Sequence, residues 1–184
     1  PEKNFLSQLQ DSKKLSVKKR EDLFSQLIQL STEKKLYFWV GVVDNYYIDI
    51  HIIRQANREA MRRALIEIQR KIPKEYQFAS VVIDGKDNYV FEELKEKPLF
   101  IVWGDAKVLE ISAASIIAKV FRDRLMDQYA LLYPEVWFEK HAWYGTKKHE
   151  QALQKNEDIT GIHRISYKPI NKVLQKKEKV LVHI

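Results

Sequence analysis

The chain has 184 residues, a length that suits one globular domain with a sizeable core. Its composition, 45% hydrophobic and 11% aromatic, excludes a disordered chain, and the lack of cysteine excludes disulfides and thiolate metal sites. No apolar run approaches the ~20 residues of a membrane-spanning helix, so we expect no membrane contact. The lack of cysteine suits a reducing cytosol, so we expect a cytoplasmic protein. The net charge of +7 makes polyanions the natural partners.

The first predicted elements are a basic segment and a helix. Ser16 is a good N-cap residue, and apolar side chains at helical spacing after Leu23 predict a helix over residues 17–30. Residues 12–14, a serine followed by two lysines just before this helix, have two interpretations. They form either a solvated turn or a phosphate contact made by lysines beside a hydroxyl group.

A strand and a long helix follow. Residues 36–43 are aromatic and β-branched, which predicts a strand. Residues 46–71 have apolar side chains at near-helical spacing and predict a helix that is broken near its start and ends before Pro73. A solvated face is the commoner explanation of its other side, which is basic. That side carries Arg54, Arg58, Arg62, Arg63 and Arg70.

Two short apolar runs, residues 78–83 and 99–103, each end directly on an acidic turn. Such runs predict strands that are buried on both faces. Ligand sites in open α/β sheets lie beyond the carboxyl ends of the strands, so Asp84 and Asp105 are expected to be neighbours. Paired carboxylates there suit a hard divalent cation. The alternative is that both are ordinary turn residues, because Asp beside Gly is common in turns.

The next predicted helix covers residues 107–130. Its expected core stripe consists of Ile111, Ala114, Ala118, Phe121 and Leu125. A different face carries small hydroxyl groups and charges, from Ser112, Ser115, Lys119 and Asp123. We expect close packing to explain the serines, and the alternative is a phosphate contact. An i,i+4 ion pair with Lys119 is the structural explanation for Asp123.

The composition changes after Pro134. Aromatic residues and histidines alternate with lysines over residues 137–149, which is typical of a surface that stacks bases and follows phosphates. A short helix over 147–155 and a final amphipathic helix after Pro169 are predicted. The histidines lack zinc-site spacing, so we expect surface or core roles for His141, His149 and His163. We divide the chain into a domain over residues 1–134 and its C-terminal extension, 135–184.

Several segments, in the same order along the chain, together resemble ribonuclease HII, which nicks duplex DNA at embedded ribonucleotides. The ISAASIIAKVFRD run at residues 111–123 is the longest and most specific of them. The others are DSKKLS at 11–16, VGVV at 40–43, AMRRA at 60–64, IDG at 83–85, GD at 104–105, HAWYGTKKH at 141–149 and HRISY at 163–167. The resemblance covers residues 9–170.

The resemblance implies an α/β fold: an RNase H-like mixed sheet flanked by helices, with a helical C-terminal extension. It implies an endonuclease that uses two divalent metals, Mg²⁺ or Mn²⁺, to hydrolyse the phosphodiester 5′ to a ribonucleotide. The substrate would be an RNA/DNA hybrid or duplex DNA containing ribonucleotides, as in ribonucleotide excision. Asp84 and Asp105 match two of the family's four metal carboxylates and are the expected catalytic residues.

The expected nucleic-acid contacts also come from the resemblance. Tyr144 matches the tyrosine that stacks at the ribose–deoxyribose junction. Ser12, Lys13, Lys14, Lys119 and Arg164 lie in motif segments near the phosphates.

The resemblance has one gap. The family's Asp-Glu pair and Gly-Arg-Gly loop, which precede the DSKKL motif, have no counterpart in residues 1–10. Three explanations stay open: a fragment, a split enzyme whose first hairpin is a separate polypeptide, or an inactive family member that binds nucleic acid. Apart from such a polypeptide, we expect a monomer.

Overall fold

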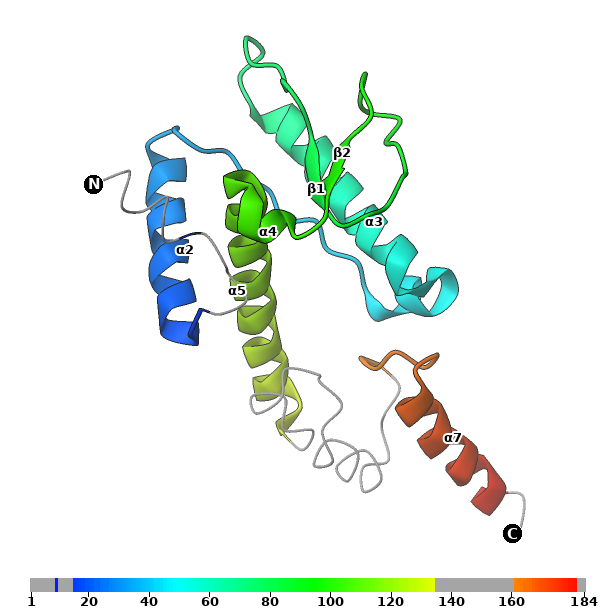
Figure 1. Cartoon of the computed structure of the whole chain (residues 1–184). Coiled ribbons are helices and arrows are strands. Elements are labelled where there is room, and N and C mark those ends of the chain that lie inside the picture. Colours follow the sequence, from blue (N-terminus) through cyan, green and yellow to red (C-terminus); the bar gives the residue numbers. More distant parts are fainter. Residues whose placement is uncertain (1–8, 10–14, 135–160, 182–184) are drawn as a thin grey trace. The chain divides into compact units, whose positions relative to one another are not determined.

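The computed structural model describes residue 9 and residues 15–134 and 161–181, with side chains up to residue 175 (Figure 1). The chain divides into two compact units, described separately below. The first comprises residues 1–42 and 60–121, and the second comprises residues 43–59 and 122–184. In the part of the chain described, no helix has the length and hydropathy needed to cross a membrane.

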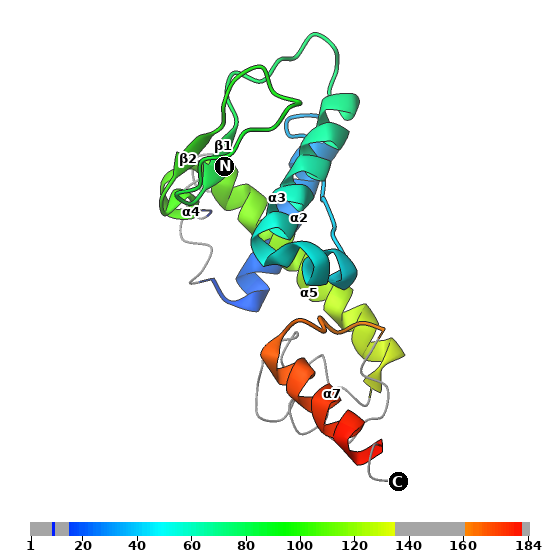
Figure 2. The ribbon, with the colours of Figure 1, turned by 90° about the vertical axis from the view of Figure 1, so that its right-hand side faces the viewer.

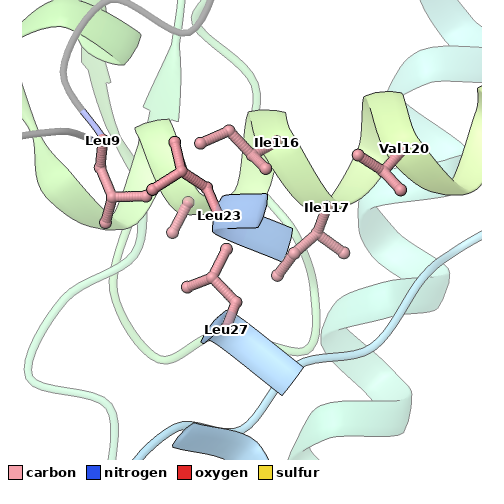
Figure 3. Packing of buried hydrophobic residues seen from close by; sticks show 7 residues of the cluster. Leu9, Leu23, Leu27, Ile116, Ile117 and Val120 are labelled. Atoms are coloured by element: carbon pink, nitrogen blue, oxygen red, sulfur yellow. The ribbon is translucent and has the colours of Figure 1, made fainter. Parts of the chain in front are cut away.

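Helix α2, Val17–Thr32, confirms the first predicted helix. Its N-cap is Ser16, whose hydroxyl oxygen accepts a hydrogen bond from the Lys19 amide at 3.2 Å. Leu23 and Leu27 are buried and join the main core of the first unit. Figure 3 shows them facing Ile116 and Ile117 of helix α5.

Helix α5, Leu109–Leu132, was predicted correctly, but the expected core stripe is wrong beyond Ile111. Ala114, Ala118 and Phe121 are exposed, and Leu125 is half-buried. The face that packs against α2 is formed by Ala113, Ile116, Ile117 and Val120. Because α5 has apolar residues on more than one side, helical spacing alone does not identify the side that meets α2.

On the serine face of α5, Ser112 has the close packing expected from the sequence. This residue is fully buried, and its hydroxyl group donates a hydrogen bond to the carbonyl oxygen of Leu9. Leu9 is itself 1% exposed and belongs to the core that α2 and α5 share. Ser112 therefore connects residue 9 to this core.

The two predicted strands are confirmed, but they are shorter than expected, and the prediction that they are buried on both faces is wrong: in the two strands only Ile83 is buried, and Leu99 is 57% exposed. Strand β1, Val82–Asp84, and strand β2, Leu99–Ile101, form a parallel pair with Val82 opposite Leu99. Ile83 packs with Leu65 of helix α3, Asn45–Lys71. Figure 2 shows α3 beside this strand pair. The wider mixed sheet stays a prediction, because the described residues contain only these two strands.

The strand predicted over residues 36–43 is wrong for the described structure, in which this segment has no regular secondary structure. Apolar alternation is present, since Leu36, Phe38 and Val40 pack on the α2–α5 core while Trp39 is 45% exposed. A strand also needs a hydrogen-bonded neighbour. No strand within the described ranges pairs with this segment, and the carbonyl oxygen of Val42 accepts instead from Arg63 Nη1 at 2.7 Å.

Gly41 lies close against the backbone of α3. A Cβ atom at Gly41 would overlap the carbonyl oxygen of Ala60 and come within 2.8 Å of the Ala64 amide nitrogen. Both are backbone atoms of a helix, so a rotamer change cannot relieve the overlap.

We therefore expect Gly41→Ala to lower the free energy of unfolding by about 1–3 kcal/mol, the usual cost of overpacking. Urea denaturation checks this value. Gly161→Ala is the matched control, because no atom of the described residues lies within 4 Å of a Cβ atom there. Equal stability of the two variants would contradict the close approach.

The predicted break in α3 is confirmed at Ile52, where φ is +61° and ψ is 158°. A β-branched residue rarely adopts a positive φ angle. The basic face of α3 is partly engaged within the protein. Arg62 pairs with Glu93 at 2.5 Å, Arg70 with Glu67 at 2.6 Å, and Arg63 contacts Val42 as described.

The second unit contains the confirmed final helix, α7, Lys168–Leu181. Ile170 and Val173 form a small buried cluster with Leu174. The predicted aromatic and basic surface over residues 137–149 and the short helix over 147–155 lie outside the described residues. The predicted boundary at residue 134 stays a prediction.

Candidate active site

The two strand-end aspartates lie at the same edge of the parallel pair, as the sequence predicts. Asp84 is the last residue of β1, opposite Ile101, the last residue of β2. Asp105 lies in the short helix α4, Gly104–Lys107, which follows β2 after two residues. Asp84 is exposed, whereas Asp105 is only 4% exposed.

A tight turn holds these two residues near each other. The Gly104 amide donates a hydrogen bond to Asp84 Oδ1 at 2.8 Å, and the adjoining residue is Asp105. Trp103, just before it, adopts the left-handed conformation, with φ at +60°. A Cβ atom at Gly104 would lie 2.6 Å from Ile111 Cδ1 and 3.4 Å from Asp84 Oδ1. The bare glycine therefore permits this close approach.

Carboxylate oxygens are the ligands that a hard divalent cation prefers, so the chemistry of Asp84 and Asp105 fits such a cation. Asp84 Oδ1 is occupied by the Gly104 amide, and Oδ2 has no hydrogen-bond partner among the residues that the structure describes. Mg²⁺ is usually held by one or two carboxylates, together with waters and substrate phosphates. Within residues 15–134 and 161–181, no group of three or more His, Asp or Glu side chains could hold a metal. The described site is therefore a two-carboxylate site.

The other predicted site residues are only partly placed. Lys119 is half-buried on α5, in the same unit as the carboxylates. Arg164 belongs to the second unit, where its guanidinium carbon lies 3.7 Å from the centre of the Tyr167 ring. Ser12, Lys13, Lys14 and Tyr144 lie outside the described residues.

Sequence reasoning missed Asp49, which contacts the HRISY segment that carries Arg164. Its Oδ2 accepts from the Ile165 amide at 2.8 Å, and its Oδ1 accepts from the Ser166 amide at 2.9 Å. The Ser166 hydroxyl group donates to Oδ1 as well, at 2.6 Å. One signal in the sequence is that Asn45 lies one helical turn before Asp49, which puts two polar side chains on the same face of the helix. This spacing does not predict which segment the two side chains contact.

These contacts change the ionisation of Asp49. Desolvation by burial acts to raise its pKa, but the Ser166 hydroxyl and the Ser166 and Ile165 amides, with the charge of Arg164, lower the pKa below its ordinary value. The contribution of the carboxylate to stability is therefore present above the unfolded-state pKa of about 3.9. It is lost as the pH falls through the lower pKa of the folded state.

Comparison with known proteins places this chain in a family. The family model described as Ribonuclease HII matches residues 2–170. Ribonuclease HII of Fusobacterium nucleatum is 43% identical over 175 residues, which cover 95% of this chain and 76% of that protein. Ribonuclease HII of Ligilactobacillus salivarius is 41% identical over 169 residues, covering 92% of this chain and 60% of that protein.

A solved structure agrees with the sequence comparison. The crystal structure of the ribonuclease H2 from Pyrococcus horikoshii OT3 matches with a TM-score of 0.72 and 26% sequence identity. The match covers 97% of this chain and 88% of that chain. These similarities define a class of protein, the metal-dependent endoribonucleases. Within this class, the chain belongs to the ribonuclease HII family.

Proposed function

We propose that this chain hydrolyses the phosphodiester on the 5′ side of a ribonucleotide, in an RNA/DNA hybrid or in duplex DNA with embedded ribonucleotides. The observation that carries this proposal is the placement of two aspartates: Asp84 ends β1, Asp105 lies in α4 just after β2, and the amide of Gly104, next to Asp105, donates a hydrogen bond to Asp84. Family membership gives the reaction class, and the net charge of +7 suits a polyanionic substrate.

Asp84 and Asp105 would hold Mg²⁺ or Mn²⁺. A bound divalent cation supplies positive charge, which activates water and stabilises a leaving oxygen. The neighbouring protein residues hold and orient the side chains of Asp84 and Asp105. The amide of Gly104 fixes Asp84 Oδ1 through a hydrogen bond, and Asp84 Oδ2 would be the oxygen that binds the cation. The near-complete burial of Asp105 restricts its side chain to a small set of positions.

The remaining contacts are assigned to the substrate. We propose that Lys119, Arg164 and residues Ser12, Lys13 and Lys14 bind phosphates, and that Tyr144 stacks at the ribose–deoxyribose junction. Lysine and arginine contacts to phosphate position a duplex but carry no sequence information. This agrees with an enzyme that recognises the sugar rather than the bases.

A nicking assay on the 184-residue chain tests the proposal. The substrate is a DNA duplex with one embedded ribonucleotide, incubated with Mg²⁺ or Mn²⁺. We expect a nick 5′ to the ribonucleotide that disappears in Asp84→Asn, because an amide is a weaker ligand than a carboxylate. A nick that survives in Asp84→Asn would contradict the assignment of this residue.

The alternative is an inactive or split family member that binds nucleic acid. Two observations favour it: the described residues contain no group of three or more side chains that could hold a metal, and segment 36–43 has no strand partner among them. A separate hairpin carrying an Asp-Glu pair would supply both missing parts. This alternative predicts duplex affinity that falls steeply with salt, without metal-dependent nicking.

A further inference from the structure

The start of helix α3 holds the turn that precedes helix α7, within the second unit. Both carboxylate oxygens of Asp49 accept hydrogen bonds from Ile165 and Ser166, three bonds in total at 2.6–2.9 Å. Hydrogen bonds to a charged carboxylate are stronger than neutral ones. One side chain therefore fixes two consecutive residues of the HRISY segment.

A second side chain on the same face of α3 also binds the HRISY segment. Asn45 lies four residues before Asp49, and its Nδ2 donates to the carbonyl oxygen of His163 at 3.0 Å. His163 is only 2% exposed, so its position is restricted by packing. Asp44 keeps the helix start in place, because its Oδ1 accepts from the Tyr47 amide at 2.8 Å.

Arg164 is the residue between these held positions. Its guanidinium group stacks on the ring of Tyr167, whose amide donates to the Arg164 carbonyl oxygen at 3.1 Å. The Asp49 oxygens are occupied by residues 165 and 166. The charge of Arg164 contributes to the lowered pKa of Asp49, but no ion pair of the guanidinium is found among the described residues, and we expect its N–H groups to bind an anion.

We infer that Asp49 is a positioning residue, which holds the 163–166 turn so that the Arg164 guanidinium is presented to a phosphate of the nucleic acid. The inference rests on the proposed function, in which Arg164 contacts phosphate. Asp49 does not touch the substrate. Its removal acts on binding only through Arg164, and this distinguishes positioning from an independent contact.

A double-mutant cycle on the full chain tests this. The variants are Asp49→Ala, Arg164→Ala and the double variant, and the measurement is duplex affinity at several salt concentrations. We expect each single variant to bind about 5- to 10-fold more weakly and to lower the salt slope by about 1. The double variant should bind no more weakly than Arg164→Ala, because coupled residues are not additive.

Two further variants serve as controls. Asp127→Asn also removes an exposed carboxylate from the second unit, and we expect its affinity and salt slope to be unchanged. Asp49→Asn keeps one acceptor oxygen and should recover part of the affinity lost in Asp49→Ala. Additive losses in the double variant, or an unchanged salt slope in Asp49→Ala, would overturn the inference.

Amide hydrogen exchange separates this inference from the proposed function. The Ile165 and Ser166 amides should exchange at least about 10-fold faster in Asp49→Ala and at the normal rate in Arg164→Ala, with no nucleic acid present. Unchanged exchange in Asp49→Ala overturns the positioning role alone. Unchanged affinity in Arg164→Ala overturns the phosphate contact of the proposed function, and the inference with it.

Discussion

Asp105→Asn is expected to reduce metal-dependent nicking by at least about 10²-fold while duplex binding persists. Even residues that only support a metal ligand typically cost 10–100-fold when removed, so loss of a ligand should cost at least that much. Asp105 is 4% exposed and the amide is nearly isosteric, so the variant keeps the local packing. Nicking rate and duplex affinity, measured on the same preparation, check the expectation.

The affinity for Mn²⁺ provides a second measurement that does not require cleavage. Titration of the chain without nucleic acid should show about 10- to 100-fold weaker Mn²⁺ binding in Asp105→Asn. Asp22→Asn, an exposed position on α2, is the matched control and should keep the original affinity. Parallel loss of cleavage and duplex binding in Asp105→Asn would count against a ligand role.

The placement of the two aspartates could be predicted because it follows from local rules. Short apolar runs that end on acidic turns gave two parallel strands, and parallel strands bring their carboxyl ends to one edge. The role of Gly104 was not apparent, since its amide reaches Asp84 across 20 residues of sequence. That Asp84 and Asp105 bind a metal stays a proposal.

The errors in the prediction have a common physical cause. Segment 36–43 has the composition of a strand, but pairing depends on a neighbour that local sequence does not specify. Helix α5 could be predicted, whereas its buried face depends on where α2 packs. Asp49 was missed because its partner Ile165 is 116 residues away. Each of these features is decided by tertiary contact rather than by propensity.

Leu23→Ala is expected to cost about 2–5 kcal/mol of unfolding free energy, the range found for truncating a buried leucine. Leu23 is fully buried in the cluster that joins α2 to Ile116 and Ile117 of α5 (Figure 3). Because α2 and α5 are helices with fixed backbones, they cannot collapse fully into the space that the side chain leaves. Urea denaturation followed by circular dichroism gives the value.

Ile28→Ala is the matched control, since it truncates an aliphatic side chain on the same helix at a position that is 37% exposed. Its helix propensity change is small and favourable, so a cost of about 1 kcal/mol or less is expected. A clear gap between the two variants would show that burial against α5, rather than helix formation, stabilises α2. Equal costs would contradict this core, because they would mean that the contacts of Leu23 with α5 contribute no more than those of a surface residue.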